Sequence, residues 1–107
     1  MNESRIQKLT TFLEEDSQDS FSRFALALEH LKAGESDTAL KHFEYIQLND
    51  PDYVGVYYHL GKLYQQIGES EKALKTVTTG IAVAREAQNH HAATELEQAL
   101  NEIETEE

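Results

Sequence analysis

The sequence repeats itself at an interval of 34 residues. Shifted by this interval, Leu26 falls on Leu60, and residues 34–36 fall on residues 68–70, which have the same sequence, Gly-Glu-Ser. Residues 39–41 likewise fall on 73–75, and both segments read Ala-Leu-Lys. A fixed period of this length is typical of helical-hairpin repeats, which bury their apolar faces by stacking on their neighbours. The period therefore predicts an all-α fold built from repeated helix pairs.

The second copy of the repeat shows how such a pair would pack. Tyr57, Leu60, Gly61 and Tyr64 follow one another at i, i+3, i+4 and i+7, so they share one face of a helix. Gly61 is small enough to let a paired helix approach closely. Ala73 plays the same part on the second helix, and the tyrosines fill the space on either side.

An aromatic residue followed by Leu-Gly, Tyr and Ala at these spacings resembles the signature of the tetratricopeptide-repeat family, in its small, bacterial-type, single-domain form. The resemblance covers roughly residues 20–87. It implies a right-handed stack of helical hairpins, an α-solenoid, and a non-catalytic protein-interaction module. Some positions depart from the signature: Arg23 and His30 in the first repeat, and Val77, Gly80 and Arg85 in the second.

The expected organisation is a single domain, 1–107, with a half repeat, two full repeats and a capping helix. Helices are expected at 3–16, 20–33, 36–48, 53–67, 70–87 and 90–104. The half repeat is 3–16, repeat one is 20–53, repeat two is 54–87, and the capping helix is 90–104. An unrelated leader helix is the alternative for 3–16. The polar outer face of 90–104 suits the end of a repeat stack.

Several residues are expected to set the helix ends. Ser4, Asp19 or Ser20, and Ser70 are candidate N-caps. Gly68 suits the left-handed conformation that ends a helix. In the first helix, Ile6, Leu9 and Leu13, together with Phe12, are expected to form an apolar face.

The composition limits the classes of partner. Nine Lys and Arg against 20 Asp and Glu give a net charge of −11, which disfavours nucleic acid and anionic membranes and favours a basic partner. The sequence has no Cys, so it cannot form a disulfide or a thiolate metal site. No signal-peptide core or membrane-spanning run is recognised, and a cytoplasmic protein is expected.

No catalytic, cofactor or metal site is expected. His90 and His91 are adjacent, and neighbouring residues of a helix point about 100° apart, so both cannot face one metal ion. His90 is interpreted as a helix-start residue and His30 as a half-buried core residue. The many carboxylates show no pairing of the kind that acid–base catalysis needs. A small enzyme or metal protein is the least favoured of three functional hypotheses.

The helix at 20–33 carries an apolar stripe, Phe21, Phe24, Leu28 and Leu31, rotated away from the repeat-signature face. The family resemblance implies that the first helix of each repeat lines a concave groove. The expected partner-binding residues are Phe21, Phe24, Leu28, Leu31, Tyr58, His59, Lys62, Gln65 and Gln66. Two alternatives stay open: the opening or the terminal helix covers the stripe as core, or a second copy covers it in a homodimer.

Some family members grip the C-terminal carboxylate of heat-shock chaperones with Lys and Asn at fixed groove positions. Here those positions hold Phe24 and Leu28 in repeat one and His59 in repeat two, so this clamp is not expected. His59 can still offer a hydrogen bond to a ligand. An apolar groove with a few amides suits an amphipathic helix better than a charged peptide tail.

Overall fold

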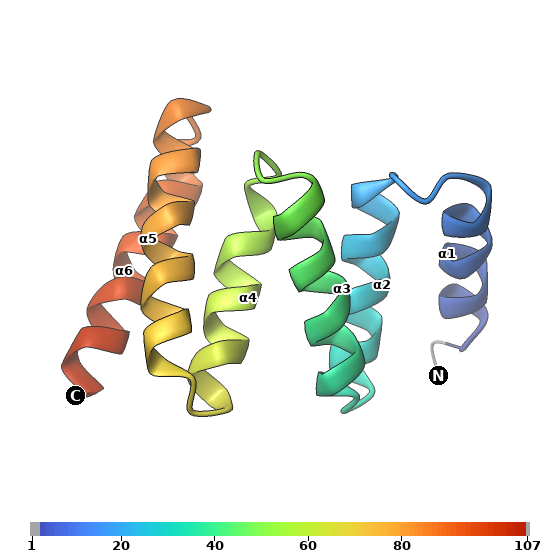
Figure 1. Cartoon of the computed structure of the whole chain (residues 1–107), viewed down its shortest axis with the longest axis horizontal. Helices are drawn as coiled ribbons and strands as arrows, with labels where there is room; N and C mark the ends of the chain where they lie inside the picture. The colour runs from blue at the N-terminus through green and yellow to red at the C-terminus, as the bar shows by residue number, and fades with distance from the viewer. Residues whose placement is uncertain (1–2, 107) are drawn as a thin grey trace. The chain divides into compact units, whose positions relative to one another are not determined.

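The computed structural model describes residues 3–106, which form six α-helices and no strand. The helices are α1 (Glu3–Glu15), α2 (Ser20–Lys32), α3 (Ser36–Asn49), α4 (Gly55–Gln66), α5 (Ser70–Glu86) and α6 (His90–Glu106) (Figure 1). All six predicted helices are therefore present, with boundaries that differ by at most two residues. Across this range, every helix is too short or too polar to span a bilayer.

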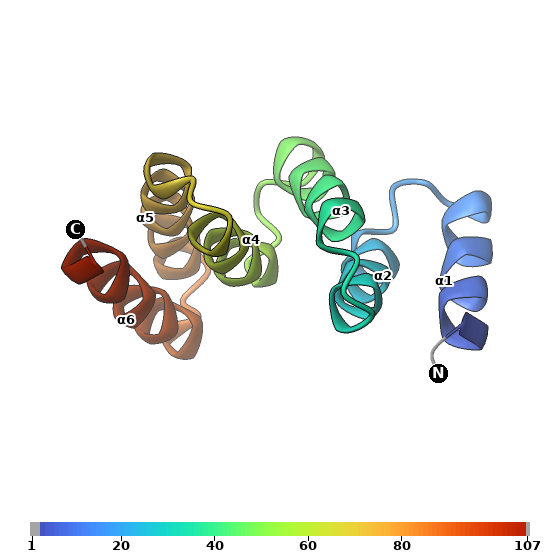
Figure 2. The ribbon, with the colours of Figure 1, turned by 90° about the horizontal axis from the view of Figure 1, so that it is seen from below.

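The described residues divide into two compact units, one ending at Asp50 and the other beginning at Pro51. Unit 1 contains α1, α2 and α3, and unit 2 contains α4, α5 and α6. Within each unit, consecutive helices run antiparallel, side by side (Figures 1 and 2). The expectation of a single domain stays a prediction.

In unit 1, α2 packs between α1 and α3. Leu9 of α1 forms a buried cluster with Ala25 and Leu26 of α2, and the partly buried Ile6 and Leu13 pack against it. The core residues toward α3 are Ala27, Ala39, Phe43 and Ile46. The expectation that Phe12 belongs to the apolar face of α1 is wrong in part. Its side chain is 50% exposed, because it lies on the flank of the stripe formed by Ile6, Leu9 and Leu13.

In unit 2, two helical glycines allow close packing. A Cβ atom at Gly61 would lie 2.5 Å from Cγ2 of Val77, so α4 and α5 meet as closely as expected. A Cβ atom at Gly80 would overlap Cβ of Tyr57 and would lie 3.2 Å from Cδ1 of Leu96. Gly80 therefore lies where α4, α5 and α6 meet. The sequence interpretation noted Gly80 only as a departure from the family signature and did not predict this contact.

The helix ends confirm some of the predicted caps and correct others. Asp19 caps α2 by accepting a hydrogen bond from the backbone N–H of Ser22 at 3.0 Å. Gly68 has a φ of 84° and follows α4 in the left-handed conformation, as expected. Ser70 is not a cap, because it is the first residue of α5, and the capping position belongs to Glu69, whose side chain makes no capping bond. Ser4 lies inside α1 rather than before it.

Candidate partner-binding surface

Two faces of α2 are occupied by its neighbours in unit 1. The face toward α1 carries Ala25 and Leu26, both under 10% exposed. On the face toward α3, Ala27 is fully buried, and the ring of Phe24 lies 6.0 Å from the ring of Phe43. The buried cluster between α1 and α2 includes none of the four residues of the apolar stripe.

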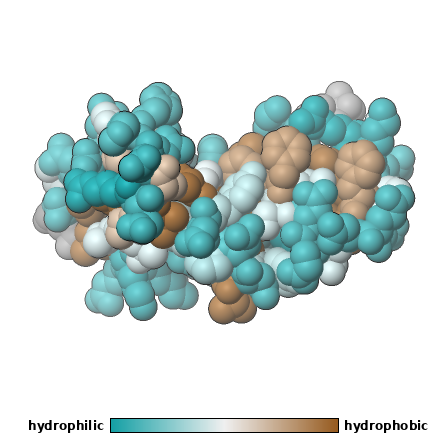
Figure 3. All heavy atoms as spheres, turned by 90° about the horizontal axis from the view of Figure 1, so that it is seen from above, coloured by the Kyte–Doolittle hydropathy of each residue, from teal (hydrophilic) through white to brown (hydrophobic). Residues whose placement is uncertain are grey.

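The apolar stripe adjoins the face of α2 that packs on α3, and Phe24 belongs to both. Phe21 is 71% exposed, the second most exposed of the large apolar side chains in the described chain, and Phe24, Leu28 and Leu31 are half-buried. Figure 3 shows apolar side chains gathered among hydrophilic ones over the α1–α2 part of the surface, at the right of the view. The first of the two predicted groups of site residues is therefore a partly open apolar surface within unit 1.

The second predicted group lies on α4 and is polar. The rings of Tyr58 and His59 meet edge to face at 5.5 Å between centroids. Lys62 Nζ lies 3.8 Å from Oε1 of Glu102 on α6. Burial lowers the pKa of the His59 imidazole, and the negative charge of Glu95 opposes this effect. Lys62 thus reaches α6, where Glu102 is an ion-pair partner that the sequence interpretation missed.

The remaining α4 residues of this group differ in exposure. Gln65 is half-buried and Gln66 is exposed. Their amides present donors and acceptors but no charge. The α4 group as a whole lacks the apolar character of the α2 stripe.

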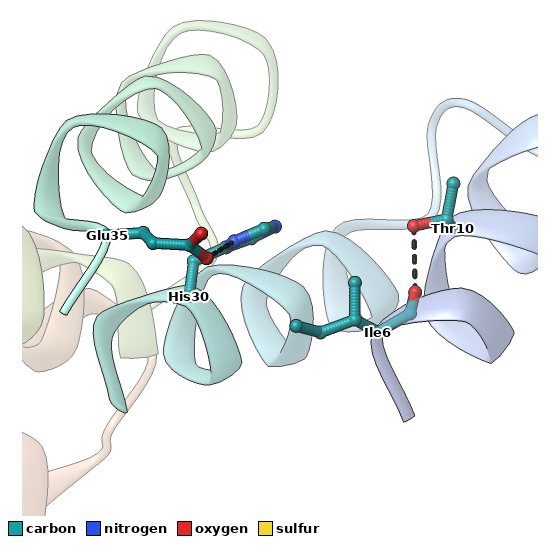
Figure 4. A network of polar contacts seen from close by, with 4 residues as sticks. All are labelled: Ile6, Thr10, His30 and Glu35. Atoms are coloured by element: carbon teal, nitrogen blue, oxygen red, sulfur yellow. Dashed lines mark hydrogen bonds and ion pairs between the residues drawn. The ribbon is translucent and has the colours of Figure 1, made fainter. Parts of the chain in front are cut away.

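A polar cluster joins α2 to α3 in repeat one. The Arg23 guanidinium lies 3.8 Å from the centre of the Tyr45 ring and 3.2 Å from Nδ1 of His42. The imidazoles of His30 and His42 stack at 5.8 Å, and Nδ1 of His30 lies 2.8 Å from Oε1 of Glu35 (Figure 4). Burial lowers the pKa of His42, and the positive charges of Arg23 and His30 lower it further. His30 is half-buried, as expected.

Glu29 is a buried carboxylate in the α1–α2 contact. Its side chain is 5% exposed, and its Oε2 lies 3.1 Å from Nε of Arg5 and 3.7 Å from Nζ of Lys32. Oε1 has no hydrogen-bond partner among the described residues. The equivalent position in repeat two holds the buried Leu63, so this carboxylate replaces an apolar core residue.

The remaining histidines do not gather into a ligand set. His90 is the first residue of α6, as interpreted from the sequence. His91 Nε2 lies 3.5 Å from Oε2 of Glu95 on the same helix. Among the side chains that the structure describes, no three His, Cys, Asp or Glu are placed so that they could hold a metal ion.

Comparison with known proteins identifies the repeat. A sequence profile described as tetratricopeptide repeat matches residues 30–100. A tetratricopeptide repeat domain protein from Salinibacter ruber is 46% identical, with 83% of this chain and 99% of that chain covered and a TM-score of 0.81. Among proteins with curated descriptions, none matches this sequence.

More distant solved structures share the fold. The TPR2B domain of yeast Sti1, solved in a complex with pHsp70, is 18% identical over 95% of this chain and 82% of that chain, with a TM-score of 0.86. The type III secretion chaperone SycD of Yersinia enterocolitica, solved with a peptide of the translocator YopD, is also 18% identical. It covers 97% of this chain and 80% of that chain, with a TM-score of 0.85. The predicted fold class is confirmed.

Proposed function

Because the chain belongs to the tetratricopeptide-repeat family, we propose that it is a non-catalytic protein-interaction module that binds a peptide or helix on its apolar surface. The observation that carries this proposal is the apolar stripe of α2. Phe21 is 71% exposed, and the stripe continues through three half-buried apolar residues outside the buried α1–α2 cluster. Monomeric proteins seldom leave contiguous apolar surface open without a use for it.

Comparison of the two repeats supports a local purpose for the stripe. At the positions 34 residues after Phe21, Phe24, Leu28 and Leu31, repeat two has Gly55, Tyr58, Lys62 and Gln65. A stripe required by the packing of every repeat would be apolar in both. The apolar residues of repeat one therefore serve something particular to α2, and a bound partner is the proposed reason.

Two relatives of the same fold have been solved with partners, Sti1 with pHsp70 and SycD with a YopD peptide. At 18% identity they share the fold with this chain, and the chemistry of its partner is inferred from its own surface. We propose an amphipathic helix, because the stripe offers apolar side chains over about three turns of α2. A partner that is neither nucleic acid nor membrane fits the charge of −11.

A display library of amphipathic helical peptides tests the proposal. The immobilised chain is expected to enrich peptides that no longer bind when Leu28 is replaced by Glu, since the substitution places a charge in the middle of the stripe. Leu40→Glu is the matched control, because Leu40 is also half-buried in unit 1 but lies on α3, outside the stripe. Enrichment that is equal for both variants, or absent for the wild type, would refute the proposed function.

Self-association is the alternative use of the same stripe. The net charge of −11 on each copy opposes it, because two copies repel each other at low ionic strength. Light scattering at micromolar concentration separates the two uses: the proposal expects a monomer, and a dimer that Leu28→Glu dissociates would support the alternative.

A further inference from the structure

Two exposed phenylalanines lie at one end of the α1–α2 hairpin. Phe12 is near the C-terminal end of α1 and is 50% exposed, and Phe21 is the second residue of α2 and is 71% exposed. The two helices are antiparallel and are joined by the short turn at 16–19, so both rings lie near this turn. The exposure of Phe12 extends apolar surface from α2 onto α1.

The same end of the hairpin is acidic. Glu14, Glu15 and Asp16 are all exposed, and no Lys or Arg occurs between Lys8 and Arg23 in the sequence. Asp19 adds a fourth carboxyl, and hydrogen bonds from Ser22 lower its pKa. Four acidic residues therefore lie at the same end of the hairpin as the two exposed aromatic rings.

The nearest cation in the sequence is already engaged. The guanidinium of Arg23 donates to the backbone carbonyl of Ser17 at 3.1 Å and lies over the Tyr45 ring. Its contact with His42 turns it further toward α3. Arg23 therefore does not pair with the carboxylates at this end of the hairpin. In the described structure, no ion pair includes Glu14, Glu15, Asp16 or Asp19.

We propose that this aromatic and acidic end of the α1–α2 hairpin docks a cationic amphipathic helix, an inference that rests on the proposed function and names the chemistry of the partner. The rings of Phe12 and Phe21 receive the apolar face of that helix. Its Lys and Arg side chains pair with the four carboxylates, and they can also lie over the exposed rings. A second copy of this chain fits poorly, because a two-fold contact here would bring the same carboxylates of both copies together.

Three synthetic helices test the charge preference. All carry leucines on one face, and the other face carries lysines, glutamines or glutamates. The lysine helix is expected to bind the full chain at least about tenfold more tightly than the glutamine helix, and the glutamate helix is expected to bind most weakly. Added salt should reduce the difference, because it screens exposed charges.

Matched variants separate a local site from a general attraction between opposite charges. Phe12→Ala, and the triple replacement Glu14→Gln, Glu15→Gln, Asp16→Asn, are each expected to weaken binding of the lysine helix about tenfold. The control triple removes three exposed carboxylates of unit 2, Glu86→Gln, Glu104→Gln and Glu106→Gln, and is expected to change binding less than about twofold. Thermal melts followed by circular dichroism confirm that each variant is folded.

The outcomes distinguish this inference from the function it rests on. Equal weakening by the two triple variants, or equal binding of the lysine and glutamine helices, would overturn the cationic partner while leaving the apolar interaction module intact. A dimer in sedimentation that Phe12→Ala dissociates would also overturn it, in favour of a second copy. If none of the three helices binds the wild type, the inference fails, and the selection from the display library decides the proposed function separately.

Discussion

Replacing Gly80 with Ala separates two opposing effects of known sign. In an exposed helix the change would stabilise the chain by about 1 kcal/mol, because Ala is the better helix former. In this chain the added Cβ atom would overlap Cβ of Tyr57, lie 2.9 Å from its Cγ and lie 3.2 Å from Cδ1 of Leu96. Carbon atoms in favourable contact lie about 3.5–4.0 Å apart, so the packing must open.

The size of the destabilisation depends on which atoms around Gly80 can move. The Cβ atom of Tyr57 is fixed to the backbone of α4, and its hydroxyl donates a hydrogen bond to the carbonyl of Pro51 at 2.5 Å. A rotation of the ring cannot relieve the overlap, so α4 and α5 must separate. Overpacking of this kind costs about 1–3 kcal/mol, and forced backbone movement places it at the upper end. After the gain in helix propensity, we expect a net loss of about 1–2 kcal/mol.

Urea unfolding followed by far-UV circular dichroism measures this difference, provided that the m-value is unchanged. Gly61→Ala is the matched control, because its Cβ atom would meet the side-chain methyl of Val77 at 2.5 Å rather than an atom fixed to the backbone. Val77→Ala should therefore rescue Gly61→Ala, whereas it should not rescue Gly80→Ala. A Gly80→Ala variant as stable as the wild type, or more stable, would refute the three-helix contact.

Three further predictions concern stability. Removing residues 88–107 should cause aggregation or a loss of cooperative melting, since it exposes the apolar face of α5; a monomer that melts sharply would contradict this. Glu29→Leu should raise the unfolding free energy by about 1–2 kcal/mol, because it removes a buried carboxylate with an unpartnered oxygen; a lower denaturant midpoint would contradict it. The lowered pKa of His42 means that the folded state favours the neutral imidazole. The stability that this preference contributes is fully present above a pH of about 6.5, the ordinary pKa of His. It is lost as the pH falls below 6.5 toward the lower pKa of His42 in the folded state. His42→Gln should flatten the acid side of the stability profile.

The sequence predicted the helices well because the 34-residue period fixes them. Each helix follows from its apolar periodicity, and the left-handed glycine at Gly68 follows from the repeat alignment. The prediction that Ser70 is an N-cap was wrong. Serine is only a preferred residue at the N-cap, and the exact start of the helix decides which residue occupies that position. At α2 the same preference was fulfilled by Asp19.

The sequence did not predict that a large side chain on one helix is matched by a small residue on the helix packed against it. Repeat two places Tyr57 over Gly80, whereas repeat one has Arg23 and Ile46 at the equivalent positions. Arg23 extends to Tyr45 and His42, and Ile46 is buried with 1% exposure. Arg23 and Gly80, each taken alone, look like departures from the family signature. The pairing of a large with a small residue is visible only when the helices are packed.

The candidate surface was predictable in part. The helical periodicity placed Phe21, Phe24, Leu28 and Leu31 on one stripe. The exposure of Phe12 was not predictable, because its spacing from Leu9 is that of an apolar face and only the packing of α1 on α2 decides which side is covered. The positions of Glu95 and Glu102 relative to α4 were likewise not predictable, because they depend on how α6 packs against α4.

The most direct test of the account measures two properties of one Leu28→Glu sample, its free energy of unfolding and its affinity for a peptide selected by the wild type. An open binding surface predicts an unfolding free energy within about 0.5 kcal/mol of the wild type, because an exposed charge is solvated, and complete loss of peptide binding. A stripe that serves as covered core predicts the reverse, since a buried, unpaired carboxylate destabilises the fold by several kcal/mol. A large loss of stability with unchanged peptide affinity would contradict the central claim.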